Sequence, residues 1–151
     1  MSSSQPNPVL SQSPEVVLID VLAQAAERSP DLKRALLLSA VPRWFDAEVV
    51  EGMFPRDEPP RISIDEIVQY LTALPFTELN PMRDNAWRFR DEYREQLLKH
   101  DAIAEQWAEL HSRAAELFKH RFDAKASVGE KKFEDRGLKD IAVEYVYHLQ
   151  Q

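Results

Sequence analysis

Four arginines that lie within twelve residues are the side chains of this chain best suited to bind an anion. Arg83, Arg88, Arg90 and Arg94 are interspersed with carboxylates, among them Asp91. A guanidinium group is permanently charged and binds a phosphate or a carboxylate through two parallel hydrogen bonds. The same arrangement fits a solvated surface on which arginines pair with neighbouring acids, and we favour this second interpretation for Arg90.

The other reactive side chains do not form a recognisable catalytic or metal site. His111 and His120 should lie roughly on one face of a helix, but no third ligand follows at helical spacing. The glutamates of that helix fit a charged solvent face, and the serines have no base nearby to activate them. The chain lacks cysteine and the G-x-x-x-x-G-K-S/T sequence that binds nucleotide phosphates. We therefore expect no catalytic residue, no metal ion and no cofactor held by this chain alone.

Helix-capping residues divide the first half of the chain into four helices that could position these groups. Ser13-Pro14-Glu15 and Ser29-Pro30-Asp31 each supply a hydroxyl cap, a proline at the first helical position and an acid near the positive helix end. Asp46 is placed to cap a third helix, and Ser63 with Glu66 forms a capping box before a fourth. A proline follows each of the last three helices and ends it.

The hydrophobic period then changes from that of a helix to that of a strand. Residues 76–79 read as a short strand, and Trp87 and Phe89 alternate with arginines as in a half-buried strand. Asp91 is expected to cap the next helix. Further apolar residues at helical spacing predict one long helix over about 101–123 and a last helix near the C-terminus.

Three helices, of which residues 64–74 form the third, and the small hairpin after them are typical of a winged helix-turn-helix. The predicted fold is therefore mainly α with a small β-hairpin wing and a helical linker behind it. We expect a disordered leader over 1–13, a winged-helix domain over 14–98 and a helical extension over 99–151. In the last helix, Tyr145 and Leu149 should pack inward. The core is expected to contain Trp44, Phe45, Phe54, Leu71, Trp87 and Phe89.

Charge argues against the function most often associated with such a fold. A helix that reads DNA needs Arg, Lys, Asn or Gln at base edges and cations at phosphates, but residues 64–74 contain no cation and the net charge is −7. The N-terminus lacks the composition of a signal peptide, and no apolar run approaches the roughly 20 residues that span a bilayer. We expect a cytoplasmic protein without a membrane partner and disfavour nucleic acid as a partner.

Several segments together resemble the winged-helix domain of the signal-transduction ATPases with numerous domains (STAND), the class that includes NB-ARC, NACHT and MalT-like proteins. The resemblance covers about residues 29–123 and rests on SPDLKRALLLSAVPRWFDAEVVEGMF, ISIDEIVQYLTALPFTEL, WRFRDEYREQLL and LHSRAAELF, with EYVYHLQ as a weaker continuation. In that family a wing histidine contacts the β-phosphate of bound ADP. Arg90 stands at the matching position, and the aspartate that follows is kept as Asp91.

The resemblance implies a regulatory module with no catalysis of its own. Arg90, with Arg88 and Asp91, would meet a phosphate or the interface with an adjacent nucleotide-binding domain of the same polypeptide, so ADP or ATP would bind only together with that domain. Tyr147 and His148 would form an edge that docks against a helical repeat domain. Two alternatives stay open: a small DNA-binding domain that uses the arginine-rich wing, and a protein-interaction adaptor.

Overall fold

The computed structural model describes residues 12–81, 83–126 and 136–151, which are mainly α-helical with one antiparallel sheet of two strands. The predicted fold class is confirmed. Most of the predicted leader and most of the polar segment before the last helix lie outside the described residues. The elements are α2 (Pro14–Arg28), α3 (Pro30–Ala40), α4 (Ala47–Met53), α5 (Ile64–Thr72), β1 (Thr77–Leu79), β2 (Trp87–Phe89), α6 (Asp91–Leu98), α7 (Asp101–Ala104), α8 (Trp107–Ala126) and α9 (Arg136–Leu149).

The predicted caps begin four of these helices. Ser13 Oγ accepts a hydrogen bond from the Val16 N–H at 3.4 Å, and the equivalent bonds of the other three caps are 2.9–3.2 Å long. Each cap satisfies a backbone donor that has no partner within its own helix, and such a cap typically contributes about 1 kcal/mol. The caps therefore fix where α2, α3, α4 and α5 begin. The other three capping residues are Ser29, Asp46 and Ser63.

The hairpin is joined to the rest of the molecule by a third backbone segment. β1 and β2 pair with Thr77 opposite Phe89, and Asn85 in the turn has a φ of 57°, a left-handed conformation that asparagine tolerates. Phe45, in the loop between α3 and α4, exchanges two backbone hydrogen bonds of 2.8 Å with Trp87. This bridge places the α3–α4 loop directly beside β2.

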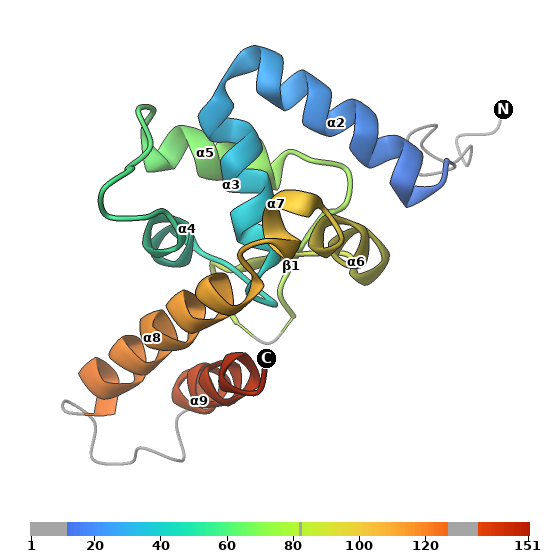
Figure 1. The fold of residues 1–151 in the computed structure, drawn as a ribbon. Helices are drawn as coiled ribbons and strands as arrows, with labels where there is room; N and C mark the ends of the chain where they lie inside the picture. The colour runs from blue at the N-terminus through green and yellow to red at the C-terminus, as the bar shows by residue number, and fades with distance from the viewer. Residues whose placement is uncertain (1–11, 82, 127–135) are drawn as a thin grey trace, which may run out of the picture.

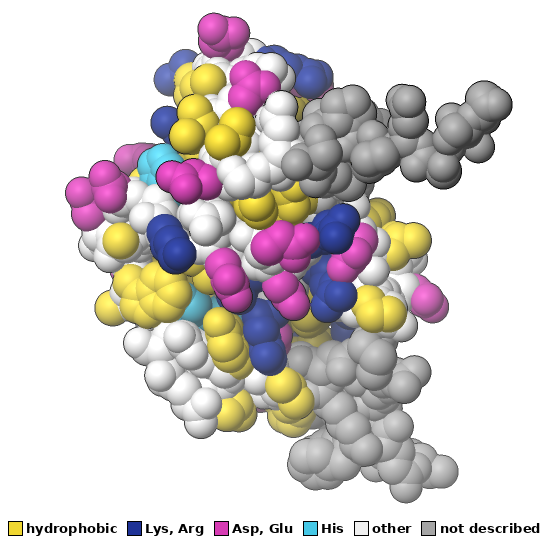
Figure 2. Space-filling view, turned by 90° about the vertical axis from the view of Figure 1, so that its right-hand side faces the viewer, with side chains coloured by type: hydrophobic (Ala, Val, Ile, Leu, Met, Phe, Trp, Pro, Cys, Tyr) yellow, Lys and Arg dark blue, Asp and Glu magenta, His cyan; other side chains and the backbone are white. Residues whose placement is uncertain are grey.

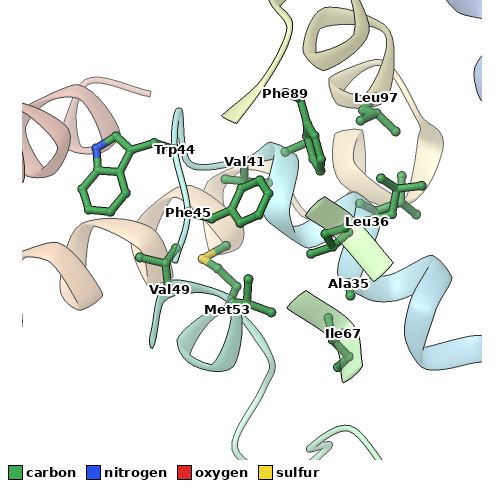
Figure 3. Close-up of a cluster of buried hydrophobic side chains, with 14 of the residues drawn as sticks. Ala35, Leu36, Val41, Trp44, Phe45, Val49, Met53, Ile67, Phe89 and Leu97 are labelled. Carbon is green, nitrogen blue, oxygen red and sulfur yellow. The ribbon is translucent and has the colours of Figure 1, made fainter. Parts of the chain in front are cut away.

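Two adjacent aromatic residues of that loop pack in different directions. Figure 3 shows Phe45 within the cluster that includes Met53 and Phe89, and Trp44 pointing the other way. The Phe45 and Phe89 rings lie 5.1 Å apart, whereas the Trp44 ring meets Phe118 of α8 edge-on at 5.2 Å. Of the six predicted core residues, five are buried and Trp87 is partly buried. The loop therefore connects the core of the first helices to α8.

The predicted continuous helix over 101–123 is wrong. The chain forms α7, makes a turn at Glu105 and Gln106, and only then begins α8. The His100 ring nitrogen Nδ1 accepts from the Ala102 N–H at 3.1 Å and caps α7. Hydrophobic spacing alone did not indicate the turn, because Ile103 of α7 and Leu110 of α8 pack into the same core on either side of it.

Helices α8 and α9 lie side by side, and α3 lies between this pair and α2 (Figure 1). Tyr145 of α9 packs against the core as predicted, but Leu149 is 59% exposed. Leu149 lies about 100° around the helix from the buried His148, so the last turn of α9 directs it to solvent. None of the helices in the described ranges has the length and apolar character needed to cross a membrane.

Candidate functional site

A pocket of about 350 Å³ lies where the α3–α4 loop, the hairpin, α6 and α9 meet. It contains two of the three predicted phosphate-binding residues, Arg88 and Asp91, but not Arg90. The pocket also brings in charged residues that sequence reasoning did not select. We call this place the arginine junction; its lining residues are Arg43, Trp44, Asn80, Arg88, Asp91, Arg94, Val143 and Glu144.

The two wing arginines are already paired with carboxylates. Arg88 stands opposite Glu78 in the hairpin register and forms a 2.8 Å ion pair with it. Arg90 pairs with Glu92 at 3.2 Å, as the solvated-surface interpretation expects. All four side chains are 40–49% exposed, so each pair contributes at most about 1 kcal/mol.

Asp91 does not cap α6, which corrects the sequence prediction. The capping position belongs to Arg90, whose side chain makes no capping hydrogen bond, and Asp91 is the first residue of the helix. The helix begins one residue earlier than predicted, because the Arg90 carbonyl already accepts from the Tyr93 and Arg94 N–H groups at 3.0 and 2.9 Å, while the Arg90 N–H bonds to the Phe76 carbonyl at 2.9 Å. Asp91 therefore acts only as an acid near the positive end of α6.

Arg94 ties three helices together at the junction. Its Nε and Nη2 donate to the carbonyls of Ala40 and Val41 at 2.8 and 2.9 Å, and Nη2 also donates to the Tyr147 hydroxyl at 3.2 Å. The two carbonyls lie at the C-terminal end of α3, where carbonyl groups lack helical partners and attract a cation. One guanidinium group thus satisfies the end of α3 and holds α9 against α6.

Arg43 and Glu144 form the second connection to α9. The Arg43 N–H donates to Glu144 Oε1 at 2.8 Å, Nε donates to Oε2 at 3.2 Å, and the guanidinium lies 4.2 Å from the centre of the Tyr147 ring. Glu144 is only 2% exposed. Burial raises the pKa of this carboxyl, but hydrogen bonds from His148 and Arg43 outweigh that effect and leave the pKa below its ordinary value.

Glu144 continues into a buried pair of histidines. His148 Nε2 donates to Glu144 Oε1 at 3.1 Å, and His148 Nδ1 lies 2.7 Å from Nδ1 of His111 on α8. His111 Nε2 is buried and has no hydrogen-bond partner within residues 12–81, 83–126 and 136–151. Burial, and then the proximity of His148 and Arg94, lower the pKa of His111 to about 4.

These contacts change the interpretation of the predicted docking edge. His148 is 2% exposed and Tyr147 is half-buried, with its hydroxyl and ring both engaged by arginines. His111 and His120 were expected on one face of the helix, but His111 is buried and His120 is exposed. Nine residues at 100° each place two side chains on opposite faces, so that expectation was wrong.

The sequence held one usable indication of this site. Glu144 lies three residues after Ile141 and four before His148, so it falls on the buried face of α9, where a carboxylate requires a partner. Arg43 could not be identified as that partner, because it lies 101 residues away in the chain.

The arginine junction brings charged groups together, and these groups are held by one another or by backbone carbonyls. Each of its three guanidinium groups has structural partners, and within the described ranges no cluster of three or more His, Asp or Glu is arranged to hold a metal ion. Comparisons of the chain with protein-family models, with curated proteins and with solved structures found no match.

Proposed function

We propose that the chain is a non-catalytic winged-helix module that couples the nucleotide state of an adjacent ATPase domain to a C-terminal sensor region. This is the role implied by its resemblance to the winged-helix domains of the STAND signal-transduction ATPases. The observation that carries the proposal is the double connection of α9 to the first helices, through Arg43–Glu144 and Arg94–Tyr147. A displacement at the hairpin or at α6 would reach α9 through these two contacts.

The energy available to such coupling is set by the contacts that differ between two states. The coupling free energy between two sites is typically about 1–3 kcal/mol, and the hydrogen bonds of two charged side chains can supply an energy of this size. Arg90 is exposed at the wing and held only by Glu92, so a phosphate of a neighbouring domain could replace that carboxylate. In this proposal Arg90 contacts the nucleotide-binding domain, and the arginine junction passes the change to α9.

A protein-interaction adaptor is the second candidate, and a specific observation favours it. Val143, Val146 and Leu149 are 57%, 48% and 59% exposed and recur every three residues along α9. Such a stripe gives the helix an apolar side that faces solvent. DNA binding receives less support, because the first turn of α5 carries Asp65 and Glu66 and the wing arginines are ion-paired. Figure 2 shows acidic and basic side chains interspersed over one face of the molecule.

The first test is the mass of the native polypeptide in its source cells, by immunoblot with an antibody against this segment. A band far above 17.5 kDa supports the coupling module, and a band at that mass overturns it in favour of the adaptor. In the longer polypeptide, Arg90→Ala should change ADP affinity and resting output, whereas Lys119→Ala, which removes an exposed cation on α8, should change neither. Unchanged ADP affinity and output in Arg90→Ala would remove the phosphate role.

A further inference from the structure

The hydrogen bond between His111 and His148 limits how many protons the two rings can carry. The two Nδ1 atoms lie 2.7 Å apart, so one proton lies between them and a second would place two N–H groups face to face. His148 Nε2 must carry a proton, because its partner Glu144 is an ionised carboxylate that can only accept. The remaining position, His111 Nε2, is buried and finds no acceptor among the residues that the structure describes.

His111 is therefore neutral whenever α9 is docked, whichever ring supplies the shared proton. If His111 supplies it, an additional proton would have to occupy the buried Nε2 atom. If His148 supplies it, His148 holds two protons beside the Glu144 carboxylate, neutral His111 holds its proton on Nε2, and an additional proton on His111 Nδ1 would break the 2.7 Å contact. A charged His111 would in both cases hold a proton on the buried Nε2 atom without an acceptor, which is costly.

We propose that His111 and His148 form an acid-sensitive latch, in which proton uptake by His111 releases α9 from α8. The latch operates whether or not the chain belongs to a larger ATPase. Its chemistry needs only the two rings, the carboxylate of Glu144 and the low polarity of the helix interface.

Among the groups that face the latch, Glu144 favours a charge on His111, but burial and the neighbouring His148 and Arg94 outweigh it. From α9 these are Glu144 and the Tyr147 ring, whose centre lies 6.2 Å from that of His111. From α6 the facing group is the cation of Arg94, and the α3–α4 loop contributes the cation of Arg43 through Glu144. Within α8 itself, Trp107 lies against the His111 ring at 4.1 Å. The one carboxylate among these groups already accepts from Arg43 and His148.

The release should be confined to α9, because α8 has its own connections to the first helices. Arg121 of α8 is 10% exposed and pairs with Asp46 at 3.0 Å, and Arg113 donates to the Met53 carbonyl at 2.8 Å. Phe118 packs on Trp44 of the α3–α4 loop. The two arginine contacts do not involve either histidine, and Phe118, which also stacks on His148 at 6.0 Å, keeps its contact with Trp44 when the latch opens.

The size of the acid response follows from the two protonation equilibria. A detached His111 titrates near its ordinary pKa of 6.5, whereas in the docked state its pKa is about 4. The detached state therefore binds more protons between these values and is favoured as the pH falls. Relative to neutral pH, the opening equilibrium should increase about 10-fold at pH 5.5 and about 70-fold at pH 4.5.

The test is hydrogen–deuterium exchange of the purified 151-residue chain at pH 7.5, 5.5 and 4.5, corrected for the pH dependence of intrinsic exchange. Amides of α9 should lose protection by about these factors, while those of α3 and α5 keep theirs. His111→Phe should flatten the response, and His120→Gln, which changes an exposed histidine of the same helix, should preserve it. Unchanged α9 protection at pH 4.5, or equal losses in α3 and α9, would overturn the latch.

A second measurement covers the case in which His111→Phe does not fold. The ring nitrogens of the four histidines in the unaltered chain can be followed by 15N NMR over the same pH range. The latch requires His111 to stay neutral until the pH approaches about 4, or until α9 detaches. If His111 becomes charged near pH 6.5 while α9 stays protected, the proposal is wrong.

Discussion

Replacing Glu144 by alanine should destabilise the chain far more than the removal of an exposed glutamate. The substitution takes the acceptor away from three donors, which are the Arg43 N–H at 2.8 Å, Arg43 Nε at 3.2 Å and His148 Nε2 at 3.1 Å. The Arg43 side chain is 41% exposed and can regain water, but His148 is buried. Unpaired buried donors cost about 1–3 kcal/mol each, so we expect a loss of about 3 kcal/mol.

The matched control is Glu92→Ala, which also removes a glutamate paired with an arginine. Glu92 and Arg90 are 49% and 45% exposed, so the loss should stay below about 1 kcal/mol. Urea unfolding of both variants at pH 7.5, followed by circular dichroism, gives the two free energies directly. Equal losses in the two variants would refute the reasoning, because the buried acceptor would then be worth no more than a solvated one.

Three further predictions concern the same contacts and the core. Arg94→Ala should lower the free energy of unfolding in urea by about 2 kcal/mol, since it uncaps the end of α3. Tyr147→Phe should lower it by about 1 kcal/mol, since it removes one hydrogen bond from the Arg94 guanidinium. A larger loss in Tyr147→Phe than in Arg94→Ala would contradict this order. The free energy of unfolding should fall by about 3 kcal/mol on acidification from pH 6.5 towards 4, because His111 takes up a proton in the unfolded chain but resists it in the folded chain. Glu144 has a lowered pKa in the folded chain, so its contribution to stability is lost only as the pH falls below the ordinary pKa of 4.5. Phe45→Ala should lower the free energy of unfolding by about 3–5 kcal/mol, since this fully buried ring contacts Phe89. A loss below about 1 kcal/mol in thermal or urea unfolding would contradict this, because the core would then have collapsed around the gap.

The arginine junction illustrates why the site was only partly predictable. Arg88, Asp91, Tyr147 and His148 were selected from sequence, and the structure brings all four to one region at or beside the pocket. Sequence reasoning treated them as two separate features because residues near 90 and near 148 share no local pattern. It also omitted Arg43, whose partner is known only once α9 has been placed in space.

Errors of the sequence analysis occurred where distant packing overrides a local rule. Asp91 has the chemistry of a helix cap, but Arg90, whose N–H is held by the Phe76 carbonyl, already accepts the first hydrogen bonds of α6 and places the cap one residue earlier. The turn at Glu105 and Gln106 separates α7 from α8, although the hydrophobic spacing across it is also consistent with one continuous helix. In both places a contact between elements fixed a boundary that local spacing left open.

Interactions between neighbouring residues were enough to predict four helix starts and the buried face of one strand. The caps at Ser13, Ser29, Asp46 and Ser63 bond to residues two or three positions away, and the alternation of Trp87 and Phe89 sets the buried face of a strand. These interactions close within one helical turn or one strand, so they are written in neighbouring residues.

The tertiary structure alone decided which charged groups became buried partners. Glu144 meets Arg43, Arg94 meets the end of α3, and His111 meets His148 across separations of 37 to 101 residues. The physical reason is that each carboxylate, guanidinium group or imidazole has many possible partners of suitable charge along the chain, and the sequence does not show which of them it will meet. Only the packing of α9 against α8, α6 and the α3–α4 loop excludes water from these particular pairs and makes them strong.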